Sequence, residues 1–208
     1  MYRQISLPKI KFKELQIKAL FWKICNKLNQ YIAKPRMVLG YTTVSGKHLP
    51  LTRISNSVDI IYPQNLEIAN NVFIWHHSII ECSNGIAIEE GCQIGAYVLL
   101  ASHSSHMAIR LYGHHYIEHN GKHLGYVKGA IRIGKFTFVG PHSVIMPGTT
   151  IGKGSIVSAY SMVKGEFPDF SVIAGNPAKV VGDTRDIDAK MLTKHPELQN
   201  YYDEWAKE

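Results

Sequence analysis

An aliphatic residue recurs at every sixth position over long stretches of this chain. The runs comprise Ile68, Ile74 and Ile80, then Ile88, Ile94 and Leu100, and then Ile133, Val139, Ile145, Ile151, Val157 and Val163. A period of six fits neither an α-helix, which repeats every 3.6 residues, nor a plain strand, which repeats every two. It indicates a chain that forms a short strand, turns and repeats, so that three strands close a triangular coil of about 18 residues.

The same spacing predicts how the coils turn and stack. Small residues often follow the aliphatic position, where a bulky side chain would collide at the corner: Gly95, Gly134, Gly140, Gly152 and Ser158. Stacked coils would pair their backbones about 4.8 Å apart. Two extra residues, Ile86 and Ala87, interrupt the upstream run. Counting faces across them predicts that Leu100 stacks between Ile80 and Ile145. The sequence therefore predicts an all-β solenoid of hexapeptide repeats.

The segments that flank the repeats differ from them in composition. Residues 10–32 carry apolar residues at helical spacing with lysines between them, and Pro35 ends this stretch. We expect this helix to cap the open end of the solenoid or to rest as a basic amphipathic helix on anionic lipid. Residues 186–208 are charged, contain Tyr and Trp, and predict a terminal helix. We divide the chain into an N-terminal helical segment (1–35), a solenoid (36–182) and a C-terminal helical tail (183–208).

The repeats break a second time at residues 104–130, in a long loop rich in His, Gly and Tyr. Long excursions without regular structure are uncommon in compact folds and are usually functional. Because a solenoid loop leaves its coil in one direction, we expect this one to arch over a neighbouring surface.

The charge and cysteine content narrow the function classes. The net charge is +7, and lysines crowd the N-terminal segment while the repeats are closer to neutral. The sequence has no stripe of Lys and Arg interleaved with aromatic residues, so it does not favour a nucleic-acid partner. An anionic cofactor or a membrane surface explains the charge instead. The three cysteines have no metal-binding spacing and predict reduced, intracellular thiols. Without an apolar run long enough to span a membrane or a signal peptide, we expect a cytoplasmic protein.

Two histidines lie where the coil ends and the long loop begins, His103 and His106. A histidine there can take a proton from a hydroxyl, which is worth roughly 10²- to 10⁴-fold in rate. The remaining histidines nearby are interpreted as solvated: His114, His115, His119, His123 and His142. Zinc needs three or four converging ligands, and no histidine pair here has a helical or cross-coil spacing that predicts them. We therefore expect no metal.

Other residues suit the binding of a phosphate or a ring. The turn from Ala174 to Lys179 (AGNPAK) exposes backbone amides, and Lys179 and Lys164 offer point charges for phosphate. Trp75 and Phe138 occupy outward positions of the hexads, where they either pack between subunits or serve as platforms for a ring.

The repeat IGKGSIVSAYSMV, the tail PDFSVIAGNPAKVV and the histidine-bearing loop between two runs resemble the hexapeptide-repeat acetyltransferases. The galactoside, maltose and surface-polysaccharide O-acetyltransferases are the most similar branches, and the resemblance covers residues 68–182. It implies a left-handed parallel β-helix that assembles as a homotrimer with active sites between subunits. It also implies acetyl-CoA as co-substrate and a histidine that deprotonates the acceptor hydroxyl for direct attack on the thioester.

Carried over position by position, the resemblance makes His103 the expected base, with His106 as the alternative. It implies the following contacts to acetyl-CoA: Phe138, Pro141, Ala159, Lys164 and Lys179. On the acceptor side, stacking puts Ser83 beneath His103, with Glu81 and Trp75 at nearby positions. Two positions depart from the family pattern: Tyr160 replaces a common glycine, and Lys164-Gly165 stands where Thr-Lys is frequent.

These features predict an acetyl-CoA-dependent O-acetyltransferase that acts on a sugar hydroxyl, of a surface polysaccharide or its precursor. The enzyme would work in the cytoplasm, peripherally at the inner face of the membrane if the N-terminal helix contacts lipid. Three alternatives stay open. They are N-acetylation of an amino-sugar by the same base, a zinc carbonic anhydrase-like enzyme on the same fold, and a non-catalytic scaffold.

Overall fold

The computed structural model describes residues 12–32, 34–119 and 122–207, and side chains in the first of these ranges from Lys18 onward. The chain separates into two compact units, residues 1–35 and residues 36–208. The first unit contains one helix, α1 (Phe12–Ile32). Its described side chains are exposed except that of Cys25, which is half-buried. Its role as a cap for the solenoid stays a prediction. Of the helices that the structure describes, none is long and apolar enough to cross a membrane.

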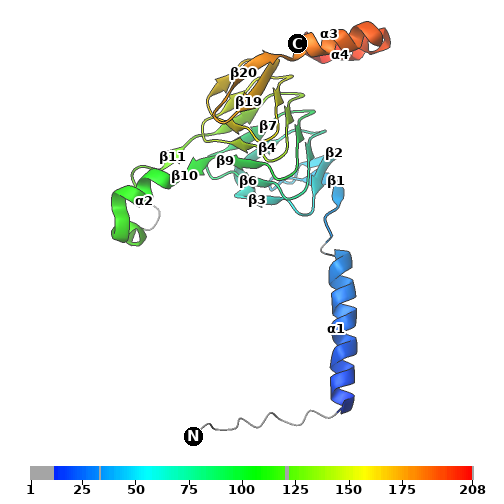
Figure 1. Ribbon diagram of the computed structural model, residues 1–208, viewed down its shortest axis with the longest axis vertical. Helices are drawn as coiled ribbons and strands as arrows, with labels where there is room; N and C mark the ends of the chain where they lie inside the picture. The colour runs from blue at the N-terminus through cyan, green and yellow to red at the C-terminus, as the bar shows by residue number, and fades with distance from the viewer. Residues whose placement is uncertain (1–11, 33, 120–121, 208) are drawn as a thin grey trace. The chain divides into compact units, whose positions relative to one another are not determined.

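The second unit is a parallel β-helix whose short strands form three faces (Figure 1). We name the faces A, B and C in the order in which the chain visits them. Face A consists of β1 (Met37–Thr42), β2 (His48–Ser55), β5 (Phe73–Ile74), β8 (Gln93–Ile94), β13 (Phe138–Val139), β16 (Ile156–Val157), β19 (Ser171–Gly175) and β20 (Ala178–Asp183). The outer pairs β1–β2 and β19–β20 are antiparallel and the rest are parallel.

Faces B and C have five parallel strands each. Face B consists of β3 (Asp59–Ile61), β6 (Ile79–Glu81), β9 (Leu99–Ala101), β14 (Val144–Ile145) and β17 (Met162–Val163). Face C consists of β4 (Leu66–Ile68), which follows the 3-10 helix η1 (Pro63–Asn65), and then β7 (Ile86–Ile88), β12 (Ile131–Ile133), β15 (Thr150–Ile151) and β18 (Glu166–Phe167). The hexapeptide solenoid predicted from the sequence is therefore present.

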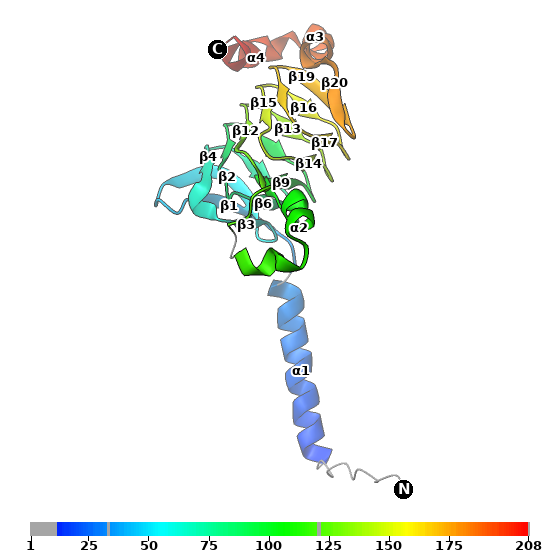
Figure 2. The same cartoon turned by 90° about the vertical axis from the view of Figure 1, so that its left-hand side faces the viewer.

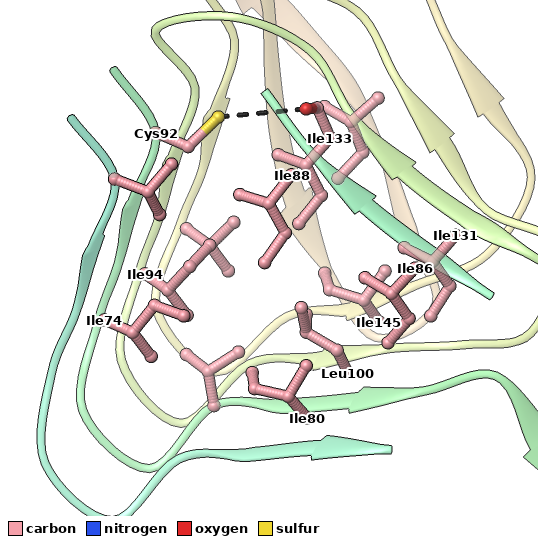
Figure 3. Packing of buried hydrophobic residues seen from close by; sticks show 14 of the residues in the cluster. Ile74, Ile80, Ile86, Ile88, Cys92, Ile94, Leu100, Ile131, Ile133 and Ile145 are labelled. Atoms are coloured by element: carbon pink, nitrogen blue, oxygen red, sulfur yellow. Dashed lines mark hydrogen bonds between the residues drawn. The ribbon is translucent and has the colours of Figure 1, made fainter. Parts of the chain in front are cut away.

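Inward apolar side chains fill the prism, usually one from each strand and two from β4, β7 and β12 (Figure 3). Leu100 pairs with Ile80 on one side and with Ile145 on the other, as the count of faces predicts, and all three are fully buried. The two extra residues of the upstream run lie within β7. There Ile86 turns inward and is 2% exposed, so the insertion adds a side chain to the core instead of disturbing it.

The small corner residues have a steric cause. A Cβ atom on Gly140 would lie 2.5 Å from the backbone nitrogen of Ala159, in the next coil, and a Cβ atom on Gly95 would lie 2.8 Å from the nitrogen of Pro141. Contacts this close are essentially never made by real Cβ atoms. The coils therefore stack at strand-pairing distance only because these corners lack a side chain.

The long loop predicted at residues 104–130 leaves the prism between β9 and β12, and it is partly helical (Figure 2). It contains β10 (His103–Ser104), α2 (His106–Tyr112), the 3-10 helix η2 (Gly113–His119) and β11 (Val127–Lys128). Strands β10 and β11 pair antiparallel and close the base of the loop. We call residues 103–128 the excursion. It projects from the prism toward the left in Figure 1.

The C-terminal tail follows β20 and packs against one corner of the last coils. It consists of α3 (Thr184–Lys194), the 3-10 helix η3 (Pro196–Leu198) and α4 (Gln199–Ala206). The ring of Trp205 packs against Phe136 and Phe170 at one corner of the last coils, with ring centroids 4.7 and 5.8 Å away. The Lys153 ammonium donates to the carbonyl oxygens of Trp205 and Ala206, where a cation stabilises a helix C-terminus.

The core position of Leu100 can be tested against an exposed leucine. Leu100→Ala should lower the free energy of unfolding by about 2–5 kcal/mol, because it opens a cavity between two stacked coils. Leu51→Ala, at a side chain that is 57% exposed on β2, should change it by less than about 1 kcal/mol. Urea unfolding followed by circular dichroism measures both. Equal losses for the two variants would contradict the inward placement of Leu100.

Candidate active site

His103 lies two residues beyond the end of β9, at the corner between faces B and C where the excursion begins. Its side chain is 38% exposed. The Nδ1 atom is 2.8 Å from Oε2 of Glu81 and 3.1 Å from Oγ of Ser83, both in the coil beneath. The sequence prediction that Ser83 stacks beneath His103, with Glu81 close by, is confirmed.

The Glu81 carboxylate is buried and accepts several hydrogen bonds besides that from His103. The donors are the Ser83 backbone amide at 2.9 Å, the Ser102 backbone amide at 3.2 Å and the Ser102 hydroxyl at 3.1 Å. Burial acts to raise the pKa of Glu81, but the hydrogen bonds from Ser83 and His103 outweigh it, and the pKa lies below its ordinary value. The group is therefore a carboxylate at neutral pH.

The contact between His103 and Glu81 sets the tautomer of the His103 imidazole. An Nδ1–H that donates to the carboxylate leaves Nε2 as the proton acceptor, because the partner of one ring nitrogen sets the tautomer of the other. In the part of the chain that the structure describes, Nε2 of His103 has no hydrogen-bond partner. The arrangement can remove a proton from a group that approaches Nε2 and can hold the resulting imidazolium next to a negative charge.

His106, the alternative base, lies apart from this pair. It opens α2 with its side chain exposed, and its Nδ1 is 2.8 Å from the hydroxyl of Ser104. The structure gives it no carboxylate partner among the described residues. Of the two candidates, only His103 has the environment of an oriented base.

Sequence reasoning missed two residues beside His103, Tyr126 and Lys128. The rings of His103 and Tyr126 have centroids 6.1 Å apart, and the Lys128 ammonium lies 5.5 Å from the Tyr126 ring. Lys128 pairs with His103 across β10 and β11. The hexad pattern contains no signal for this pairing, since it joins the two ends of a segment in which the repeat is absent.

One prediction from the sequence, that His123 is solvated, is wrong. His123, interpreted from the sequence as solvated, is only 9% exposed. Its ring stacks on Tyr116 with centroids 3.9 Å apart, and its Nε2 bonds to the Tyr116 carbonyl oxygen. Its Nδ1 is buried and has no hydrogen-bond partner among the residues that the structure describes. Four aromatic rings surround it and give the excursion a small core of its own: Tyr112, Tyr116, His119 and Tyr126.

The residues predicted to contact the cofactor do not form one group. Phe138 is 42% exposed on face A, and Pro141 and Ala159 lie on the corner between faces A and B. Lys179 pairs with Ala174 in the outermost hairpin of face A. Lys164, in contrast, follows β17 at the corner between faces B and C, the corner that carries His103. Face B therefore separates His103 and Lys164 from the other four.

Trp75, predicted to lie near Glu81 and Ser83, does not join them. It follows β5 on the corner between faces A and B, is 45% exposed, and contacts the rings of Phe73 and His76. Within one chain it therefore lies on the opposite edge of face B from His103.

Four stacked rings line this same corner, one from each of four coils: His77, Tyr97, His142 and Tyr160. Successive centroids are 5.0, 4.9 and 4.8 Å apart. All four residues have positive φ angles of 57–59°. We call this stack the ring ladder. Its signal in the sequence is an aromatic residue at the same position of each coil, and it accounts for Tyr160 where the family commonly has glycine.

Two cysteines belong to the core and not to the site. Cys82 and Cys92 are fully buried, and burial raises the pKa of each thiol to about 12. Neither is a thiolate at neutral pH, so neither can serve as a nucleophile. Among the described residues, no group of three or more His, Cys, Asp and Glu side chains has an arrangement that could hold a metal ion.

Comparison with known proteins agrees with this architecture. Residues 130–165 match the family described as "Bacterial transferase hexapeptide (six repeats)". A probable acetyltransferase of Mycobacterium tuberculosis is 42% identical over 60 residues, which is 29% of this chain and 20% of that protein. A putative lipopolysaccharide biosynthesis O-acetyl transferase of Escherichia coli is 44% identical over 52 residues, which is 25% of this chain and 26% of that protein. The matched segments are thus under a third of these curated relatives.

Among solved structures, a galactoside acetyltransferase in complex with coenzyme A superposes with a TM-score of 0.53 at 26% identity. The match covers 64% of this chain and 62% of that one. A hexapeptide-repeat acetyltransferase of Vibrio cholerae complexed with acetyl coenzyme A gives a TM-score of 0.52 at 20% identity, covering 61% and 64% of the two chains. The repeats and the fold are thus similar to those of hexapeptide-repeat transferases, and the family match itself is confined to residues 130–165.

The Glu81 carboxylate should make the stability of the protein pH-dependent. Its pKa is lower in the folded chain than the unfolded value of about 4.3. Its stabilising effect is therefore complete above that value and is lost as the pH falls through the folded pKa. The advantage of the wild type over Glu81→Gln in the free energy of unfolding should shrink between neutral pH and about pH 3. Urea titrations at several pH values measure it.

Glu67→Gln provides the control, because Glu67 is exposed on the outer side of face C. This variant should stay close to the wild type at every pH. An advantage over Glu81→Gln that is the same at acid and neutral pH would mean that the carboxylate has no linked proton.

Proposed function

We propose that this protein is an acetyl-CoA-dependent O-acetyltransferase that acetylates a sugar hydroxyl, of a surface polysaccharide or its precursor, in the cytoplasm. The observation that carries the proposal is the half-exposed His103, held through Nδ1 by the buried Glu81 carboxylate with Nε2 unpaired. The names of the relatives support the reaction class, and the O-acetyl transferase of Escherichia coli supports a sugar acceptor. The same relationships support the left-handed sense of the β-helix.

The reaction needs one proton to move twice. Acetyl-CoA supplies the acetyl group as a thioester. His103 takes the proton of the acceptor hydroxyl at Nε2 while the hydroxyl oxygen attacks the thioester carbonyl carbon. The carbon–sulfur bond breaks, and the imidazolium returns the proton to the leaving sulfur, so that the ester and free CoA thiol result. Glu81 stabilises the imidazolium between the two transfers, and its distance of 2.8 Å from Nδ1 suits that role.

Glu81 and Ser83 are therefore assigned to the imidazole and not to the acceptor. Both contact Nδ1 of His103 from the coil beneath. Acceptor contacts are assigned instead to Tyr126 and Lys128, which flank His103 on the side of the excursion. An aromatic ring suits the apolar side of a sugar ring, and an ammonium suits an anionic group on the acceptor.

A second copy of the chain is required to complete the site. His103 lies on one edge of face B, and three of the residues assigned to acetyl-CoA lie on or beyond the other edge: Phe138, Pro141 and Ala159. Within one chain these two sets of residues therefore lie on different edges of face B. The site therefore lies between subunits, with His103 from one copy and the face A residues from its neighbour. Lys179 would bind the cofactor phosphates from the latter copy, and Lys164 from the former.

The outer surfaces of the three faces support such an assembly. The outward column of face B is apolar apart from Asp59 and includes Ile79, Leu99, Val144 and Met162. That of face A is largely apolar and includes Phe73, Phe138, Ile156 and Val172. Face C is polar, with Glu67, Arg132, Thr150 and Glu166. Two apolar faces that meet at one corner suit a homotrimer in which each prism packs against two others.

The excursion carries exposed apolar side chains that a neighbouring copy would cover: Met107, Ile109, Leu111, Ile117 and Leu124. Leu124 is 78% exposed and Ile117 is 82% exposed. This supports the expectation that the excursion arches over an adjacent subunit.

The catalytic proposal predicts different outcomes for substitutions of His103 and His106. His103→Ala should lower kcat about 10²- to 10⁴-fold, because the acceptor loses its base. His106→Ala should retain most of the activity and serves as the matched control. The assay follows free thiol released from acetyl-CoA in the presence of candidate glycans. Full turnover by His103→Ala would overturn the mechanism, and activity on amino-sugars alone would favour N-acetylation.

The assembly proposal predicts that one face tolerates a charge and another does not. Val144→Asp, in the outward column of face B, should shift the protein from trimer to monomer and abolish turnover, since a buried unpaired carboxylate is costly. Thr150→Asp, in the outward column of face C, should remain trimeric and active. Size-exclusion chromatography with light scattering measures the mass. A Val144→Asp variant with unchanged mass and activity would contradict the proposed interface.

A further inference from the structure

The side chains of α1 from Lys18 to Ile32 divide into two arcs. At about 100° per residue, seven residues fall within an arc of about 140°: Leu20, Phe21, Ile24, Cys25, Leu28, Tyr31 and Ile32. The opposite arc holds the lysines, asparagines and Gln30 of the segment, together with Ala19 and Trp22. Six of the seven residues of the apolar arc are exposed, from 55% for Ile32 to 80% for Tyr31, and only Cys25 is half-buried.

The charge of the whole protein is concentrated in this unit. Residues 1–35 contain eight of the 23 lysines and arginines but only one of the 16 acidic residues. This segment therefore carries the entire net charge of +7, and the remaining residues, with fifteen of each sign, sum to zero. Between Lys18 and Ile32 the helix has no acidic residue.

The described lysines are placed where a helix at a lipid surface needs them. Lys18 and Lys27 lie at the two margins of the apolar arc, and Lys23 lies farther round on the polar side. A lysine at such a margin can extend its ammonium toward phosphate groups while its methylenes stay with the apolar side chains. Trp22 and Tyr31 are 63% and 80% exposed, and they are the two aromatic residue types that are enriched at membrane–water interfaces.

We propose that α1 docks the protein on a bilayer that contains anionic phospholipid. The helix lies parallel to the surface, with its apolar arc at the level of the acyl chains and its lysines among the headgroups. Each lysine near an anionic surface strengthens binding about fivefold. This inference rests on α1 alone and is independent of the reaction that the prism performs.

A second copy of α1 is a poorer occupant of the apolar arc. In a bundle of identical helices, the marginal Lys18 and Lys27 would flank the seam on every copy, where like charges repel and no acidic residue between Lys18 and Ile32 compensates. The second unit, which has no net charge, offers no overall electrostatic attraction either. An anionic lipid surface satisfies both the apolar arc and the lysines.

Vesicle sedimentation of the full-length protein tests the proposal. The protein should sediment with mixed phosphatidylcholine–phosphatidylglycerol vesicles and stay in solution with pure phosphatidylcholine vesicles. The bound fraction should fall as salt is added, because salt screens the lysines. Changing Lys18, Lys23 and Lys27 together to Gln should weaken binding about a hundredfold. Failure to bind the anionic vesicles at low salt would overturn the proposal.

A pair of variants separates the apolar arc from the charge. Ile24→Asp with Leu28→Asp places two carboxylates in the apolar arc and should abolish sedimentation. Asn26→Asp with Gln30→Asp adds the same charge at the same spacing on the polar arc and should retain most of the binding. Equal binding by the two double variants would overturn the proposal. So would a fall in molecular mass that only the first pair causes, without a loss of vesicle binding, because it would assign the arc to self-association.

Discussion

The structure depends on the stacking of inward aliphatic side chains along the axis of the prism. Each strand contributes as few as two or three residues, too little to hold a sheet by itself, and it is the burial of residues such as Ile80, Leu100 and Ile145 in one column that fixes each coil on the next. The backbone pairing between coils then follows, provided that the corners are narrow. Gly95 and Gly140 meet that condition, since neither leaves room for a Cβ atom.

The geometry of the candidate site is a consequence of this stacking. Glu81 directly follows the inward Ile80, and Ala101 directly follows the inward Leu100, so the two coils superimpose their corners residue by residue. His103 and Ser83 each lie two residues farther along and meet at 3.1 Å. The carboxylate is held by backbone and hydroxyl groups of the same corner, at Ser83 and Ser102, and not by a flexible loop. The position of the His103 imidazole is therefore fixed by the corner of the prism itself.

Sequence reasoning reached the features that repeat and missed those that do not. The hexad period predicted the three faces, the partners of Leu100 and the position of Ser83 beneath His103. When one side chain of each hexad must point inward, the residues that pair between coils follow from counting positions along the chain. It missed Tyr126 and Lys128, which reach His103 through a strand pair that closes a non-repeating segment. It interpreted His123 as solvated, because nothing in a polar stretch indicates that several tyrosines will enclose an imidazole.

Two residue pairs between β10 and β11 close the base of the excursion, His103 with Lys128 and Ser104 with Val127. The core on either side of this narrow stem is continuous, because β7 pairs with β12 as though no insertion were present. Changes in the length or composition of the excursion can therefore accumulate without cost to folding, while any strain they cause reaches the imidazole of His103 directly. Under the proposed function, remodelling of the excursion alone would change the acceptor preference and leave the coils that hold His103 unchanged.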